Sequence, residues 1–128
     1  MKGFSADIEQ ETVDNTDFRR VLYSGEHAQL VLMSLVENSE IGSEIHSDND
    51  QFFRFESGEG IVTIDGIDHE VADGSAIIVP AGARHNVKNT SDTEPLKLYT
   101  IYSPAHHPDG TVHVTKAEAD MAEHDHHH

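Results

Sequence analysis

An Asp-Gly pair between two apolar segments is the feature that most limits how this chain can fold. Asp65-Gly66 separates Ile61–Ile64 from Ile67–Val71. A two-residue hairpin loop of type I′ needs a positive φ at both central residues, and Asp-Gly is among the pairs that adopt this conformation most easily. Residues 61–71 are therefore predicted to form a β-hairpin.

Short segments rich in branched and aromatic residues recur on both sides of this hairpin, separated by turn-forming residues. They are Phe18–Tyr23, Gln29–Leu35, Glu44–His46, Gln51–Glu56, Ala76–Val79, His85–Asn89 and Leu96–Tyr102. A strand about every eight to twelve residues, with no long helical pattern between strands, is typical of an all-β sandwich or barrel. The sequence therefore predicts an all-β fold.

The length of 128 residues suits a single domain. We assign the barrel to residues 17–115. Residues 1–16 are polar and are expected to form an N-terminal arm or an edge strand. Residues 116–128 contain helix-favouring residues but no apolar face, so they are expected to form a polar, frayed tail.

Composition excludes several classes of function. The chain has 8 Lys and Arg against 24 Asp and Glu, a net charge of −16, which argues against nucleic acid or an anionic membrane as partner. The absence of cysteine excludes disulfides, thiolate metal sites and a thiol nucleophile. No signal-like or bilayer-length apolar segment occurs, so a cytoplasmic protein is expected.

Residues 74–89 carry the most specific motif of the chain. They read GSAIIVPAGARHNVKN and fit the pattern G-x5-P-x-G-x2-H-x3-N. Pro80 and Gly82 end one strand in a tight turn, and strand alternation then places His85 and Asn89 on one face of the next strand. This segment resembles the second conserved motif of the cupin superfamily, and every defining position matches.

Residues 41–60 resemble the first cupin motif, G-x5-H-x-H-x3-4-E-x6-G, but depart from it at two ligand positions. With the register anchored on the glycine at the end of the segment, Gln51 stands where the motif has Glu. His46 then takes the position of the second His, and Glu44 that of the first. An alternative register makes His46 the first His and Asp48 the second, but it changes the spacing to Gln51.

The resemblance implies a metal site made of Glu44, His46, Gln51 and His85. Glu44 and His46 are two residues apart on a strand, so both point to the same face. Two imidazoles, a carboxylate and an amide oxygen suit a divalent transition metal, namely Zn, Mn, Fe, Ni, Co or Cu. The amide lowers the expected affinity relative to a Glu ligand. The alternative is a polar barrel interior that holds no metal.

The resemblance covers residues 18–103 and implies a small jelly-roll barrel, or double-stranded β-helix, often a homodimer through exchanged edge strands. The chain also resembles compact single-domain cupins labelled mannose-6-phosphate isomerase-like. That likeness rests on DQFFR at 50–54, PAG at 80–82, YSP at 102–104 and HPDGTVH at 107–113. The label records similarity and does not establish an activity.

Aromatic residues near the inferred site are candidates for substrate binding. Phe53 follows Gln51 on the same face of its strand. Tyr99 and Tyr102 lie on opposite faces of the last long strand, and Tyr102 is our candidate for the inward one. Arg54 and Arg84 are out of phase with the inferred ligands and are expected to face outward.

Further histidines follow the last long strand. His106, His107 and His113 flank the turn signal Asp109-Gly110, and this segment either covers the barrel mouth, its own or a partner's, or forms a polar loop. The histidines at 124 and 126–128 are interpreted as a solvated or added tail, with a native metal-binding tail as the alternative.

Two functions fit these observations. One is a metal-dependent enzyme, isomerase-like or oxygenase-like, that acts on a small polar molecule, either sugar-like or oxygenated. Glu44 is the only inward carboxylate inferred, and as a metal ligand it could not serve as the base of an isomerase. The other function is non-catalytic binding or sensing of a metal or small ligand. A purely structural role is the least supported, because buried polar groups make a poor core.

Overall fold

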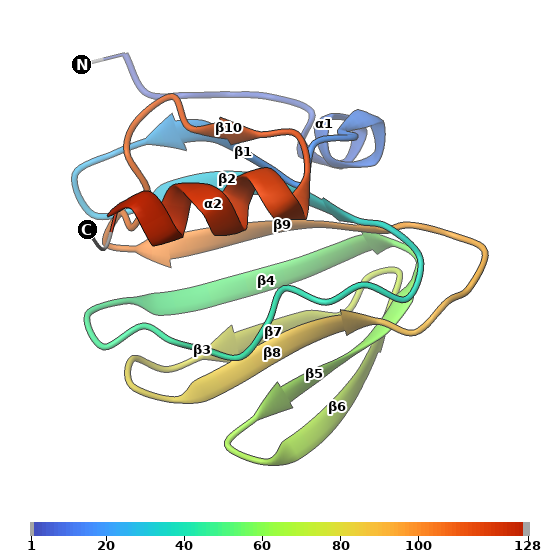
Figure 1. Ribbon diagram of the computed structural model, residues 1–128. Helices are drawn as coiled ribbons and strands as arrows, with labels where there is room; N and C mark the ends of the chain where they lie inside the picture. The colour runs from blue at the N-terminus through green and yellow to red at the C-terminus, as the bar shows by residue number, and fades with distance from the viewer. Residues whose placement is uncertain (1, 127–128) are drawn as a thin grey trace.

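Two antiparallel sheets make up most of the molecule. The computed structural model describes the backbone of residues 2–126 and the side chains as far as residue 122. Within this range the sheets have the strand orders β10-β1-β2-β9-β4-β7 and β3-β8-β5-β6 (Figure 1). The elements are α1 (Ile8–Asp14), β1 (Arg19–Ser24), β2 (Gln29–Leu35), β3 (Glu44–Ile45), β4 (Asp50–Ser57), β5 (Glu59–Ile64), β6 (Ile67–Ala72), β7 (Ala76–Val79), β8 (Arg84–Asn89), β9 (Leu96–Ser103), β10 (Val112–His113) and α2 (Lys116–His126).

The predicted all-β jelly-roll architecture is confirmed, and the hairpin that led to it forms as expected. β5 pairs with β6 from Glu59 opposite Ala72 to Ile64 opposite Ile67. Asp65 and Gly66 have φ values of 46° and 82°, which are the positive angles that a type I′ turn requires.

Strand alternation divides the barrel interior into an apolar and a polar end. In β4 the side chains of Gln51, Phe53 and Phe55 are buried, whereas the intervening residues are only half-buried. Gln51 pairs with Tyr102 of β9, whereas Phe55 pairs with Leu98, which is also fully buried. The apolar core therefore fills one end of the barrel and leaves inward polar side chains at the other.

Residues 1–16 were expected to form an arm or an edge strand, and residues 8–14 instead form the short helix α1. Asp7 caps the helix by accepting a hydrogen bond from the backbone N–H of Gln10 at 3.2 Å. Thr12 is fully buried, and its hydroxyl donates to the carbonyl of Ile8 at 2.7 Å. A local cap and one buried contact are therefore enough to form a helical turn here.

The expectation of a frayed C-terminal tail is wrong for most of this segment, because residues 116–126 form α2. Thr115 accepts a hydrogen bond from the backbone N–H of Glu118 at 3.1 Å, and Ala119 is buried, whereas the rest of residues 116–122 are exposed or half-buried. The last two histidines of the tail, 127 and 128, lie outside the described residues. In residues 2–126 we find no helix with the length and apolar character needed to span a bilayer.

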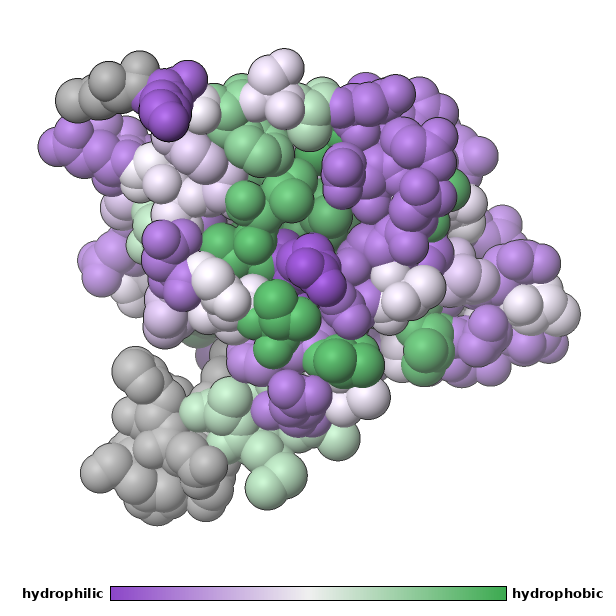
Figure 2. All heavy atoms as spheres, turned by 90° about the horizontal axis from the view of Figure 1, so that it is seen from above, coloured by the Kyte–Doolittle hydropathy of each residue, from purple (hydrophilic) through white to green (hydrophobic). Residues whose placement is uncertain are grey.

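One face of the molecule collects hydrophobic side chains. Figure 2 looks onto the β1–β10 edge of the larger sheet and shows a hydrophobic centre surrounded by hydrophilic residues. The segments along this edge expose Phe4, Val112 and Val114. Apolar patches of this kind are common at protein–protein contacts. The expected homodimer nevertheless stays a prediction.

Two glycines offer a test of the fold. A Cβ at Gly60 would collide with the Lys88 carbonyl oxygen of β8, whereas Gly66 has open space around it but a positive φ. We expect Gly60→Ala to lower the free energy of unfolding by about 3 kcal/mol through overpacking. Gly66→Ala should lower it by about 1 kcal/mol through backbone strain. Urea denaturation of both variants measures the difference, and equal losses would contradict this account of β5–β8 packing.

Candidate functional site

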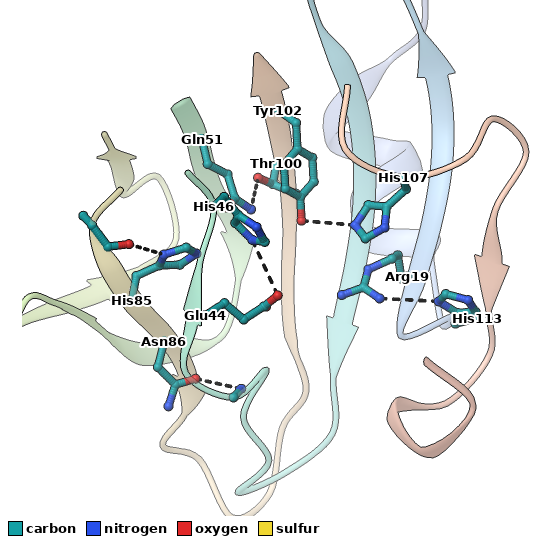
Figure 3. Close-up of polar contacts among 12 residues, drawn as sticks. Arg19, Glu44, His46, Gln51, His85, Asn86, Thr100, Tyr102, His107 and His113 are labelled. Carbon is teal, nitrogen blue, oxygen red and sulfur yellow. Dashed lines mark hydrogen bonds and ion pairs between the residues drawn. The ribbon is translucent and has the colours of Figure 1, made fainter. Parts of the chain in front are cut away.

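The four inferred ligands lie together at the polar end of the barrel (Figure 3). Glu44 of β3 is the cross-strand partner of His85 of β8. Gln51 lies near the start of β4, and His46 follows β3 directly. His46, Gln51 and His85 are buried, and Glu44 is half-buried. Residues from three strands and one loop therefore face a common interior region.

The distances within this group are short. Glu44 Oε2 lies 3.5 Å from His46 Nε2. The ring centroids of His46 and His85 are 5.2 Å apart. The alternative ligand Asp48 has an exposed side chain, so the structure does not bring it to the group.

Two buried polar atoms of the group have no hydrogen-bond partner within the described residues, although one of them has the 3.5 Å contact with the Glu44 carboxylate. They are His46 Nε2 and Gln51 Oε1. Gln51 uses its amide nitrogen to donate to Thr100 Oγ1 at 3.0 Å, which turns the amide oxygen away from that contact. Buried polar atoms in proteins are nearly always satisfied. These two atoms are thus suited to bind a group that the protein itself does not supply.

His85 is held in one tautomer by the backbone. Its Nδ1 lies 3.2 Å from the carbonyl oxygen of Ala83, and a carbonyl can only accept a hydrogen bond. Nδ1 therefore carries the proton, and Nε2 keeps its lone pair. A backbone carbonyl that orients a histidine in this way is the usual arrangement behind a metal-binding imidazole.

Burial keeps the imidazoles of the site neutral. Desolvation lowers the pKa of His46 to about 4, and His106, His85 and Arg19 add to the effect by charge repulsion. Desolvation also lowers the pKa of His85, although its bond to Ala83 acts in the opposite direction. Neutral imidazoles are the form that binds metal ions.

The donor set fits a divalent ion in its chemistry, while the present side-chain positions do not enclose one. Among the described residues, no group of three or more His, Asp or Glu side chains is placed to hold an ion. Gln51 Oε1 and His46 Nε2 are nevertheless buried and without a hydrogen bond, and neutral His85 offers a lone pair on Nε2. These residues and Glu44 are the ones that would hold such an ion.

The aromatic candidates also lie at this end of the barrel. The Phe53 ring is fully buried, with its centroid 6.2 Å from that of His85. Tyr102 is the inward tyrosine, with its ring 5.7 Å from His46. Tyr99 is half-buried and packs against Phe52 with a centroid distance of 6.2 Å. Tyr102 is therefore the tyrosine that faces the site.

Of the two readings of the segment after β9, the structure favours the one in which it covers the site. The His106 ring lies 4.3 Å from that of His46 and stacks on Tyr102 at 5.2 Å. His107 Nε2 lies 3.3 Å from the Tyr102 hydroxyl. Residues 106 and 107 thus pack over the polar end of the barrel.

The Gln29 side chain holds residues 106 and 107 in place through hydrogen bonds to their backbone. The sequence analysis did not single out this residue. Its side chain is fully buried in β2. Its Oε1 accepts hydrogen bonds from the backbone N–H groups of His106 and His107 at 3.1 and 3.0 Å, and its Nε2 donates to the His107 carbonyl at 2.7 Å. An amide in an otherwise apolar strand was the signal that could have identified it.

The two arginines expected to face outward do so. Arg54 forms an ion pair with Glu56 at 2.8 Å, and its side chain is 41% exposed. Arg84 is exposed, and its Nη1 donates to Ser43 Oγ at 3.3 Å.

Comparison with known proteins agrees with this architecture. Residues 31–102 match the cupin domain family. The chain belongs to the cupin family. It is 52% identical to the uncharacterized protein YrkC of Bacillus subtilis (strain 168), over 95% of this chain and 68% of YrkC. It is 42% identical to the uncharacterized protein L612 of Acanthamoeba polyphaga mimivirus, over 91% of this chain and 74% of L612.

A solved cupin-type structure extends the likeness to nearly the whole molecule. The crystal structure of BH2720 from Bacillus halodurans superposes with a TM-score of 0.91 at 48% identity. The match covers 94% of this chain and 95% of that chain, which is more than the cupin domain alone.

The half-buried His107 makes stability depend on pH. Desolvation, followed by the charge of Arg19, lowers the pKa of His107 to about 2, against 6.5 for the free side chain. Between these values the unfolded chain binds the extra proton, so the free energy of unfolding falls as the pH falls below 6.5.

We therefore expect wild type to lose roughly 1 kcal/mol more than His107→Gln between pH 7 and pH 5.5, a figure that allows for the partial exposure of the ring. Urea denaturation at both pH values measures this. His27→Gln is the matched control, because the His27 side chain is 87% exposed. Equal pH dependence in wild type and His107→Gln would contradict the burial argument.

Proposed function

We propose that this cupin binds one divalent transition-metal ion in its barrel and acts with it as an enzyme on a small polar molecule. The observation that carries the proposal is the pair of buried polar atoms without a hydrogen bond, His46 Nε2 and Gln51 Oε1, beside Glu44 and the tautomer-fixed His85. Glu44 completes the set with a negative charge. The mixture of nitrogen and oxygen donors is compatible with Zn, Mn, Fe, Ni, Co or Cu.

A bound ion would polarise an oxygen of the small molecule and stabilise negative charge that develops on it, as an isomerase needs, or would activate dioxygen, as an oxygenase needs. The protein supplies the surroundings. The Phe53 and Tyr102 rings beside the site are buried, and the exposed His106 ring stacks on Tyr102. Buried apolar surroundings strengthen the electrostatic interactions next to them.

Tyr102 and His107 are the groups placed to handle a proton. The 3.3 Å contact between the Tyr102 hydroxyl and His107 Nε2 lets the two share one hydrogen bond. When His107 Nε2 is the donor, the phenol can in turn donate to a substrate oxygen beside His46. The pair thus offers a proton donor distinct from Glu44, whereas the base that an isomerase also needs is not assigned to a residue.

The alternative is a cupin that binds a metal or small ligand without turnover. The amide of Gln51, in the place where a carboxylate is the common ligand, favours this alternative because it makes the ion easier to release. Loss of a small-molecule reaction in Tyr102→Phe, with metal content unchanged, would distinguish the enzyme from the binding protein.

The first test is metal content. In a protein with His124, His126, His127 and His128 replaced by Ala, we expect close to one divalent ion per chain by elemental analysis after loading and desalting. Added substitutions His46→Ala and His85→Ala should reduce this to a small fraction, because both imidazole ligands are lost.

The control for this test replaces two exposed histidines, His27→Ala and His69→Ala, in the same background. Its metal content should match that of the parent. A parent protein that holds no metal even after loading would overturn the metal-dependent function.

The second test concerns Gln51. Gln51→Glu supplies a second carboxylate to the ion, so metal affinity should rise by about tenfold. The same change buries a carboxylate when no ion is present, so the metal-free variant should melt several degrees below wild type. Thermal denaturation with and without the ion measures both effects, and Gln51→Met controls for loss of the amide. A metal-free melting temperature that does not change would contradict the buried position of this ligand.

A further inference from the structure

Arg19 is a buried cation at an unusual place in this acidic protein. It begins β1, and its side chain is only 3% exposed. Its neighbour Arg20 points the other way and forms an ordinary surface ion pair with Asp17 at 2.7 Å. Arg and Lys side chains are almost never fully buried unless a partner compensates their charge.

The described residues do not supply that compensation. Arg19 Nη1 lies 3.4 Å from His113 Nδ1, and its guanidinium carbon lies 5.2 Å from the centroid of the Phe18 ring. Its Nε has no hydrogen-bond partner, and within residues 2–122 no ion pair joins Arg19 to a carboxylate. One imidazole nitrogen and an aromatic face account for only part of the five N–H donors of the guanidinium.

The guanidinium faces the site. In Figure 3 it extends from β1 toward the region between Tyr102 and Glu44. Its positive charge is close enough to lower the pKa values of both His46 and His107. Those two imidazoles flank the Tyr102 ring, so Arg19 lies on the side of this ring away from His85.

We propose that Arg19 binds the anionic group, a carboxylate or a phosphate, of a small molecule held in the barrel. A planar guanidinium pairs with such a group through two parallel hydrogen bonds. A second oxygen of the same molecule would reach the ion held by His46 and His85, and this part rests on the proposed function. The substrate class is therefore a small organic acid or phosphate ester with a further oxygen a few bonds away.

The test uses isothermal titration, with three probes, of the full-length protein in which the tail histidines His124, His126, His127 and His128 are replaced by Ala, both metal-free and nickel-loaded. This parent is the wild type of the comparisons below. Malonate carries two carboxylates, inorganic phosphate stands for a phosphoryl group, and propane-1,3-diol is the uncharged counterpart of malonate. We expect wild type to bind one of the two anions and not the diol. The anion that binds shows whether the site accepts a carboxylate or a phosphate.

Arg19→Met should weaken binding of that anion by about tenfold or more, the loss expected when a charge-assisted pair is removed. Its nickel content should equal that of wild type, because Arg19 is not a ligand. Arg20→Met is the matched control on the same strand, and its anion affinity should stay within about twofold of wild type. Equal affinity in Arg19→Met and wild type would overturn the proposal, as would failure of wild type to bind either anion.

Two further measurements cover the case in which Arg19→Met does not fold. Arg19→Lys retains the charge but lacks the planar fork, so it should fold and bind the anion more weakly than wild type. Wild-type crystals soaked in the bound anion should show it within hydrogen-bond distance of the Arg19 guanidinium, and an anion found only elsewhere overturns the proposal.

The metal and anion parts can fail separately. If wild type holds no nickel but metal-free protein binds the anion in an Arg19-dependent manner, the proposed metal function fails and the Arg19 site stands. If nickel binds in stoichiometric amounts and Arg19→Met leaves anion affinity unchanged, the proposed anion site at Arg19 fails and the proposed metal site stands.

Discussion

The register between β4 and β9 is the constraint on which the candidate site depends. It pairs Gln51 with Tyr102 and Phe55 with Leu98, so polar residues of both strands meet at one end and apolar residues at the other. The pairing of β2 with β9 brings Gln29 opposite Tyr102 in the same way. A slip of one residue would turn each of these side chains to the other face of the sheet. The position of the site is therefore set by backbone pairing before any ligand is present.

Burial then determines the chemistry of the groups that the register assembles. The same desolvation that keeps His46 and His107 neutral leaves their lone pairs available, and it makes the charge of Arg19 difficult to leave uncompensated. Desolvation therefore explains both the neutral imidazoles and the energetic cost of the charge on Arg19. These are the two kinds of group on which the proposed metal ion and the proposed anion would bind.

Local patterns in the sequence predicted the strands and much of the site. Asp65-Gly66 was sufficient for the hairpin, and the spacing around His85 placed it inward, because both depend on nearest neighbours along the chain. Helix α2 was missed although Thr115 and Glu118 form a capping pattern, since the segment has no apolar stripe. The burial of Arg19 and the hydrogen bonds of Gln29 to residues 106 and 107 depend on contacts between residues far apart in the chain. The periodicity of apolar residues in the sequence does not reveal such contacts.

The division of the barrel into two ends also bears on how proteins of this kind diverge. Phe55, Leu98 and Val87 are fully buried at the apolar end and contribute packing that does not involve the ligands. Substitutions at the polar end can then change what the barrel interior binds while the apolar contacts that stabilise the fold are retained. Specificity can therefore change in such a barrel without a large loss of stability.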